Sequence, residues 1–242
     1  MNDKDNKILA IGVYLSDQTN NALTITNQLF QAQNWEVECH WVAIGHGEVP
    51  QQLMPITTVS LIRKNKFKLI NELINKFRLS DYRYLLVTDD DIDLPEAFLD
   101  TYLGLQSKYG FALAQPARTH DSYIDHKFVT QLLGVEARRT RFVEIGPLFS
   151  VERQAYQLLT PFDQEAPMGW GLDFVWPVVL EDSGAKLGII DGAPVTHALR
   201  KPVAFYDYTS TAHAMSEFLR SHRHLTREDA FLALETYPLG SS

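Results

Sequence analysis

Apolar and polar positions alternate along the chain in blocks that predict strands and helices in turn. Continuous apolar runs are typical of strands buried on both faces, and apolar residues three or four apart indicate helices. The runs predict strands at 8–15, 35–44, 59–62, 83–87, 111–115, 141–150 and 187–191. Helical spacing predicts helices at 20–33, 66–77, 95–103 and 171–182. This alternation predicts an α/β fold with helices flanking a sheet.

The 242 residues are compatible with one domain, and we find no repeat or linker that would divide it. We therefore expect a single domain over residues 1–242, with a helical C-terminal tail from about residue 205. Thr226 followed by Asp229 resembles a capping box and predicts the start of a helix in that tail. Pro95 is the first residue of the helix predicted at 95–103, and proline is favoured at that position of a helix.

Charge and cysteine content narrow the class of protein. A net charge of −8 argues against non-specific nucleic-acid binding, which needs a basic face. The single cysteine, Cys39, cannot form an internal disulfide and indicates a reducing compartment. No apolar run reaches the roughly 18 residues of a membrane span, and the N-terminus lacks a signal peptide. We expect a cytoplasmic protein without an integral membrane segment, and peripheral association with the inner face of a membrane stays open.

The most informative segment is an apolar run, 84–87, that ends in the acids Asp89, Asp90, Asp91 and Asp93. Clustered carboxylates repel one another and are costly to hold together without a cation. A buried strand that delivers acids at its carboxyl end is a common way for α/β proteins to place a metal beside a phosphate. The segment therefore predicts a cation site.

Four interpretations of the acids compete. A calcium loop fails because Leu94 stands where that loop needs glycine. A phosphatase loop of the Asp-x-Asp type lacks the expected hydroxyl residue after its second acid. Capping of the helix at Pro95 explains Asp93 but not the acids upstream of it. The fourth is an Asp-x-Asp metal site, in which Asp89 and Asp91 share one face of an extended segment and Asp90 points away.

Three further segments follow in the order that the fourth interpretation requires: 142–150, 169–173 and 187–197. Together with 84–94 they resemble the family called domain of unknown function 707, which is itself similar to glycosyltransferases of the GT-A fold. The resemblance covers roughly 82–202. It implies a GT-A-like, Rossmann-like mixed sheet flanked by helices. The first 80 residues match only in their general strand–helix character.

The resemblance also implies roles for individual residues. Asp89 and Asp91 would be the Asp-x-Asp pair, with one carboxylate holding Mn²⁺ or Mg²⁺ and the other orienting ribose. His197 would be the third metal ligand. Trp170 would stack on a sugar, and Asp173 would contact the acceptor hydroxyl as a general base if configuration is inverted. Arg200 and Lys201 would contact the donor phosphates.

Each assignment has a structural alternative. His197 could bond a backbone carbonyl, Trp170 could be core packing, and Asp173 could cap the helix that follows Gly171. The basic residues Arg138, Arg139 and Arg141 could contact donor phosphates or simply form a solvated turn. The tail histidines are expected at the surface: His213, His222 and His224.

The sequence thus predicts a metal-dependent glycosyltransferase that moves a sugar from a nucleotide-diphosphate donor to a saccharide, a lipid-linked acceptor or another hydroxyl. Two alternatives stay open. One is an inactive carbohydrate- or nucleotide-binding module of the same fold, and the other is a metal-dependent phosphohydrolase or nucleotidyltransferase that uses the same acids. The donor base, the sugar and the stereochemical outcome cannot be read from the sequence.

Overall fold

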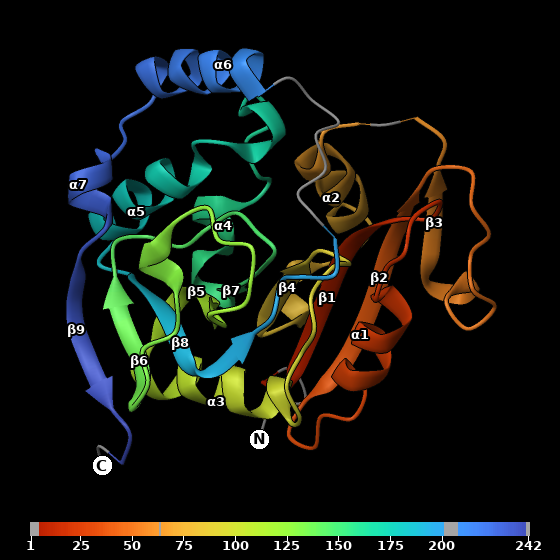
Figure 1. Ribbon diagram of the computed structural model, residues 1–242, viewed down its shortest axis with the longest axis horizontal. Helices are drawn as coiled ribbons and strands as arrows, with labels where there is room; N and C mark the ends of the chain where they lie inside the picture. Colours follow the sequence, from red (N-terminus) through yellow and green to blue (C-terminus); the bar gives the residue numbers. More distant parts are fainter. Residues whose placement is uncertain (1–4, 63, 201–207, 241–242) are drawn as a thin grey trace.

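A single mixed β-sheet crosses the protein and carries helices on both faces (Figure 1). The computed structural model describes residues 5–62, 64–200 and 208–240. Over these residues the strand order is β3-β2-β1-β4-β7-β5-β8-β6-β9. The predicted α/β class, a mixed sheet flanked by helices, is confirmed.

The strands are β1 (Lys7–Leu15), β2 (Glu36–Ile44), β3 (Thr57–Ser60), β4 (Tyr84–Thr88), β5 (Phe111–Arg118), β6 (Val135–Thr140), β7 (Leu148–Glu152), β8 (Lys186–Val195) and β9 (Ala233–Pro238). The α-helices are α1 (Ala22–Leu29), α2 (Lys66–Ile74), α3 (Phe98–Tyr109), α4 (Tyr156–Leu159), α5 (Leu172–Asp182), α6 (Tyr208–Ser221) and α7 (Arg227–Ala230). Short 3₁₀ turns are η1 (Met54–Ile56), η2 (Leu79–Asp81), η3 (Lys127–Val129), η4 (Arg153–Ala155) and η5 (Pro167–Gly169).

Strand direction gathers six carboxyl ends at one edge of the sheet. Strands β1 to β4 run parallel to one another, and β5 runs parallel to β8. Strand β7 is antiparallel to both β4 and β5, so the two groups point the same way. In open α/β sheets, ligands bind outside the carboxyl ends of the strands. This edge is where the predicted site should lie.

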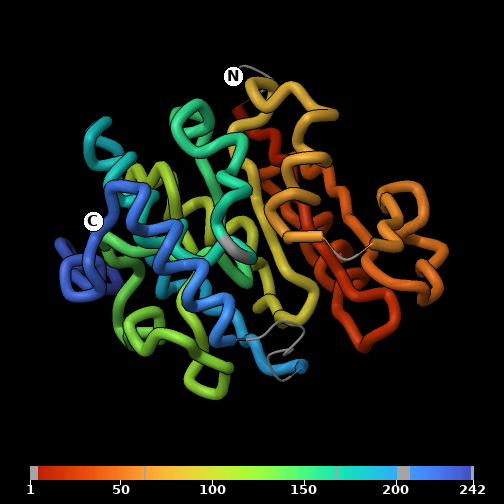
Figure 2. The backbone as a smooth tube through the Cα atoms, turned by 90° about the horizontal axis from the view of Figure 1, so that it is seen from above, coloured from red at the N-terminus to blue at the C-terminus, as the bar shows by residue number. Residues whose placement is uncertain are grey.

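Strand β1 is buried on both faces, as its continuous apolar run predicts. Ile8 and Ala10 pack in the cluster that includes α1 and α3, whereas Leu9 and Ile11 pack in the cluster that includes α2 and α5. Helix α6 lies over the face of the sheet that α2 and α5 cover, next to η5 (Figure 2). Its side chain Phe218 is buried there. The sheet is thus covered on both sides, which fixes its carboxyl edge as the open rim.

The strand predicted at 141–150 is wrong. The chain forms β6 before it and β7 at its end, and residues 141–147 are an irregular connection between them. The two strands are separated in the sheet by β5 and β8, so the connection has to cross the sheet. Strand β6 escaped prediction because the charged Arg138 is buried in it, bound to Asp191 with Nε–Oδ2 of 2.9 Å.

The helix predicted from Pro95 begins later, at Phe98, and the proposed cap at Asp93 is wrong. Asp93 instead forms a backbone bridge with Thr196, which keeps the chain extended past the acids. Ala97 then adopts a left-handed conformation with φ of 51° before the first helical turn. The start of α3 is therefore set by a tertiary strand contact and not by the proline signal.

The end of the chain is helical only in part. Helices α6 and α7 agree with the predicted tail, and the Thr226 side chain caps α7 by accepting the Asp229 N–H. Strand β9 follows and pairs antiparallel with β6, which the prediction of a helical tail did not include. The β9 sequence is almost entirely exposed, so it has no apolar pattern to reveal it. Across the described ranges, none of the helices has both the length and the apolar character of a membrane span.

Candidate functional site

The carboxyl ends of β4 and β8 bring the predicted site residues together. Strand β4 leads directly into the acid run 89–93, and the segment after β8 lies against this run. Asp93 and Thr196 exchange backbone hydrogen bonds of 2.8 and 3.1 Å. This bridge places His197 beside the acids, although the two segments are far apart in the sequence.

Asp91 and His197 are in direct contact. Asp91 Oδ1 lies 3.2 Å from His197 Nε2, and Asp91 Oδ2 accepts a hydrogen bond of 3.0 Å from Arg200. Burial raises the pKa of Asp91, but the hydrogen bond and charge of His197, with those of Arg200, outweigh it and lower the pKa to about 2. The Ser122 hydroxyl fixes the His197 backbone by accepting its N–H at 3.0 Å. Asp91 is therefore an ionised carboxylate held beside an imidazole.

Strand alternation predicts that Asp90 points away from Asp89 and Asp91, but it does not. Its carboxylate is buried and accepts the Leu15 N–H at 2.9 Å. It also accepts hydrogen bonds from Arg200, the same guanidinium that contacts Asp91. The prediction is wrong because β4 ends before the acids, so successive side chains no longer alternate between two faces. Arg200 therefore neutralises two of the acids at once.

Asp89 is paired with a residue that the sequence did not single out. Lys66 Nζ lies 2.6 Å from Asp89 Oδ1, and both side chains are largely buried. Lys66 opens α2, where the Asn65 side chain accepts the Phe67 N–H at 2.9 Å as an N-cap. Over residues 5–62, 64–200 and 208–240, no three His, Cys, Asp or Glu side chains are grouped closely enough to hold a metal ion. The predicted ligand trio is thus two residues in contact, with Asp89 held apart by a lysine.

The backbone approaches the Asp89–Lys66 pair closely at Gly146. A Cβ added to Gly146 would lie 3.0 Å from Asp89 Oδ2 and 3.2 Å from Lys66 Nζ. A side chain at this position would crowd the pair, and Asp89 or Lys66 would have to shift by a few tenths of an ångström. The segment before β7 therefore forms one wall of the site.

Asp173 lies in the first turn of α5 and is almost completely buried. Its Oδ1 has no hydrogen-bond partner. Burial raises its pKa to about 7, although backbone amides of the same turn oppose the rise. The alternative interpretation, an N-cap, is wrong because Gly171 occupies that position. Asp173 is thus a carboxyl that changes protonation near neutral pH.

A second buried carboxyl, Glu144, was missed by sequence reasoning. Its Oε2 accepts a hydrogen bond of 3.0 Å from Arg118, which is itself buried at the carboxyl end of β5. Burial raises the pKa of Glu144 to about 8, with Arg118 opposing and the charges of Asp125 and Asp173 adding to the rise. A charged residue that ends an apolar strand, as Arg118 does, is the signal that could have found this pair.

The remaining predicted residues divide into three groups. Trp170 is partly buried, and its ring packs edge-on to Tyr208 with centroids 5.2 Å apart. Lys201 lies outside the described residues. Each member of the basic group binds an acid: Arg138 to Asp191, Arg139 to Glu235 and Arg141 to Glu181. The solvated-turn interpretation is wrong for Arg138 and Arg139, which lie in β6.

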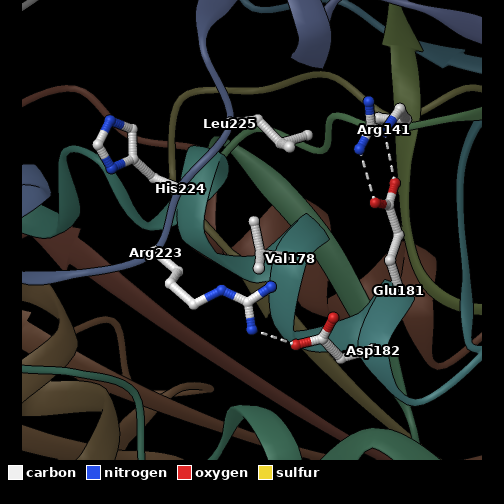
Figure 3. Close-up of a pocket in the computed structure, with 7 residues that line it drawn as sticks. All are labelled: Arg141, Val178, Glu181, Asp182, Arg223, His224 and Leu225. Atoms are coloured by element: carbon white, nitrogen blue, oxygen red, sulfur yellow. Dashed lines mark hydrogen bonds and ion pairs between the residues drawn. The ribbon is translucent and has the colours of Figure 1, made fainter.

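A separate shallow pocket lies between α5 and the α6–α7 connection (Figure 3). Its charged side chains bind one another, with Arg141 and Glu181 forming one pair and Arg223 and Asp182 another. Arg141 and His224 line it, whereas no acid of the 89–93 run does, nor do Asp173 and His197. This pocket is therefore not the candidate site.

No family model matches the chain, and no curated protein sequence matches it. The resemblance to the domain of unknown function 707 therefore stays a prediction. Solved structures do match the fold. The crystal structure of GalNAc-T7 with UDP, GalNAc and Mn²⁺ superposes with a TM-score of 0.56 at 13% identity, over 88% of this chain and 47% of that chain.

A mannosyltransferase from Pyrobaculum calidifontis, in complex with GDP-Man and Mn²⁺, also superposes with a TM-score of 0.56. The identity is 12%, over 90% of this chain and 65% of that chain. This chain thus spans less than two thirds of the length of both structures. Both are glycosyltransferases of the GT-A fold, and the predicted GT-A-like fold of this chain is confirmed.

Proposed function

We propose that this protein is a metal-dependent glycosyltransferase that transfers a sugar from a nucleotide-diphosphate donor to a hydroxyl of a saccharide or lipid-linked acceptor. The observation that carries this proposal is the contact between Asp91 and His197 at the carboxyl edge of a GT-A-like sheet. A cation beside the diphosphate assists departure of the nucleotide, and a base beside the acceptor hydroxyl assists an inverting transfer. Both kinds of group lie at or near this edge.

Asp91 and His197 would hold the cation, Mn²⁺ or Mg²⁺. Asp91 Oδ1 and His197 Nε2 lie 3.2 Å apart as an ion pair, and both would turn to the cation in place of that contact. An imidazole nitrogen favours Mn²⁺ over Mg²⁺. When bound, the cation neutralises charge that develops on the leaving diphosphate.

The basic side chains next to the acids would bind the donor. Arg200 contacts Asp90 and Asp91, and Lys66 contacts Asp89. An arginine fork suits bidentate recognition of phosphate, and a lysine supplies a compact positive charge. Asp89 would orient the ribose or serve as a further metal ligand, and Lys201 would join Arg200 at the phosphates.

Asp173 would accept the proton of the acceptor hydroxyl if the reaction inverts configuration. A general base works best when its pKa lies near the working pH, and the pKa of Asp173 is about 7. Its Oδ1 has no hydrogen-bond partner but is buried, so the acceptor hydroxyl would reach it only if the covering side chains moved. Trp170, three residues earlier, would offer a ring face to the sugar.

Calorimetry with UDP- and GDP-linked sugars tests the proposal directly. Binding should require Mn²⁺ or Mg²⁺ and should disappear in excess chelator, and unchanged binding in chelator would refute metal dependence. Because Lys66 and Arg200 already neutralise the acids, a binding module without turnover is the second candidate. Release of free nucleotide, measured with and without saccharide acceptors, separates the two, because a binding module would bind the donor without cleaving it to nucleotide and sugar.

A further inference from the structure

Residues 61–78 have a charge opposite to that of the chain as a whole. This stretch contains six Lys and Arg residues and a single acid, Glu72, in a protein with a net charge of −8. Its centre is α2, which buries Phe67, Ile70 and Leu73 and leaves its charged face outward. The apolar face of α2 packs in the core, so the lysines on its outer side are what it can offer to an anionic surface.

Exposed aliphatic side chains lie next to these basic residues. Strand β3 forms one edge of the sheet, with α2 beside it (Figure 1). A groove between β3 and α2 is lined by side chains of both elements, including Val59, Lys64 and Lys76. Leu61 and Ile62, in the connection between the two, are 62% and 68% exposed. We define the β3–α2 patch as Val59, Leu61, Ile62, Lys64, Lys68 and Lys76.

The positive charge of the patch exceeds what Glu72, the one acid beside it in residues 61–78, can offset. Glu72 accepts hydrogen bonds of 2.8 and 3.0 Å from Lys64. Lys76 contacts the hydroxyl of Thr58 at 3.3 Å, and Lys68 is exposed one helical turn before Glu72. Two lysines of the patch therefore face solvent without a carboxylate partner in the patch.

We propose that the β3–α2 patch binds an anionic membrane surface. Leu61 and Ile62 enter the interfacial layer, and Lys68 and Lys76 face the lipid phosphates. The pairing of aliphatic with basic side chains favours lipid over nucleic acid, because single-stranded nucleic acids are held by stacking on aromatic rings and the patch has none. The attachment is peripheral, since it uses a surface loop and the outer face of a helix.

The patch also lies close to the candidate site. Lys66, on the same helix, binds Asp89 at 2.6 Å. A protein bound through the patch would therefore hold its acid run near the lipid surface, which suits a lipid-linked acceptor. The proposal itself rests on the patch alone, and it survives if the protein transfers no sugar.

Flotation with lipid vesicles tests the proposal on the full chain. The protein should float with vesicles of phosphatidylcholine and phosphatidylglycerol, and not with phosphatidylcholine alone. Binding should fall steeply between 0.05 and about 0.5 M salt, since the Debye length shortens to a few ångströms. Absence of flotation at low salt, or equal flotation with both vesicles, would overturn the proposal.

Two pairs of variants separate the contributions. Lys68→Glu with Lys76→Glu should weaken binding at least about twentyfold, because each lysine near an anionic surface contributes about fivefold. Leu61→Ser with Ile62→Ser should also weaken binding. Matched controls at exposed sites elsewhere, Lys127→Glu and Leu133→Ser, should leave flotation and the melting temperature unchanged.

The lysine and aliphatic variants also distinguish the alternative partners. Flotation that depends on the lysines but not on Leu61 and Ile62 would overturn the insertion of these two side chains. Fluorescence anisotropy with labelled DNA tests nucleic acid as the partner. Binding to DNA with no flotation would overturn the membrane assignment, as would a loss of flotation in the control variants equal to that in the patch variants.

Discussion

Two groups of carboxyls in this protein have opposite acidities. Asp91, at the end of β4, has a pKa lowered to about 2, whereas Asp173 and Glu144 have pKa values raised to about 7 and about 8. All three side chains are largely buried, so burial alone does not explain the difference. What differs is the number of cationic partners set against the cost of burial. Asp91 contacts both Arg200 and His197. Glu144 contacts Arg118, whose charge does not outweigh the burial of the carboxyl, and Asp173 has an oxygen without any partner.

The difference teaches how one residue type can supply two kinds of chemistry in one protein. A carboxylate held ionised by cationic neighbours is suited to bind a metal ion. A buried carboxyl with few donors is suited to take up and release a proton near neutral pH. We call Asp89, Asp90 and Asp91 the rim acids, after their place at the end of β4; among them the pKa of Asp91 is lowered by its cationic neighbours, whereas burial raises the pKa of Asp90. We call Glu144 and Asp173 the buried acids. Breaking each group separately tests whether the two roles are distinct.

Replacing Asp91 by Asn should give the largest effect. The variant keeps the shape of the side chain but removes its negative charge from His197 and Arg200. We expect Mn²⁺ binding, measured by calorimetry, to be lost, and metal-dependent release of nucleotide from the donor to fall by at least about a hundredfold to a thousandfold.

Asp93→Asn is the matched control for that variant. Asp93 belongs to the same acid run, but its carboxylate is exposed and accepts a hydrogen bond of 2.8 Å from Asn21. Its replacement should leave Mn²⁺ affinity within about twofold. Equal losses in both variants would mean that the whole run acts as a diffuse negative patch, and the special status of Asp91 would be wrong.

Replacing Asp173 by Asn should give a smaller loss of a different kind. Removal of a general base costs at least about a hundredfold in rate, and we expect kcat to fall by about that lower limit. Mn²⁺ and donor affinity should not change, because Asp173 is not among the rim acids. In the unmodified protein the rate should decline as the pH drops below about 7, since the base must be deprotonated.

Asp182→Asn provides the control on the same helix. Asp182 ends α5 and is exposed, with a contact of 2.7 Å to Arg223. The variant should retain both the rate and its decline at low pH. A pH profile unchanged in Asp173→Asn, or a loss of Mn²⁺ affinity there, would contradict the separation of the two groups.

Sequence patterns predicted the rim acids better than the buried acids. The continuous apolar runs of β4 and β8 mark strands whose carboxyl ends share an edge. Periodicity did not single out His197; its assignment beside Asp91 came from the resemblance to the domain of unknown function 707. The two side chains lie 3.2 Å apart, and their role as metal ligands stays a prediction.

The rest depended on tertiary contacts that periodicity does not contain. Lys66 meets Asp89 across two elements, and Arg118 meets Glu144 through a connection that was predicted as a strand. Arg138 interrupts the apolar pattern of β6 because its partner Asp191 lies on the next strand. Each of these pairs satisfies a charge through a distant residue, so neither member is recognisable alone.

The smallest expected effect is on the pH dependence of stability, where Asp91 and the buried acids should act in opposite directions. The unfolded pKa of Asp91 is near 3.8, so its contribution is present above about pH 4 and is lost as the pH falls towards 2. The buried acids act in the opposite direction. Their folded pKa values are raised, so their contribution is present below about pH 4 and is lost as the pH rises to about 7 or 8. The free energy of unfolding contributed by these groups should therefore decline between pH 5 and 8.

Urea unfolding of the unmodified protein and of Asp173→Asn, at pH 5, 6, 7 and 8, measures this decline. The variant should lose less stability over the range, and the difference between the two slopes isolates Asp173 from every other titrating group. Each unit of pKa difference corresponds to about 1.4 kcal/mol, so the full difference is on the order of a few kcal/mol. Asp182→Asn should parallel the unmodified protein. Parallel lines for Asp173→Asn as well would mean that the Asp173 carboxyl titrates normally. The proposed difference in acidity between Asp173 and Asp91 would then be wrong.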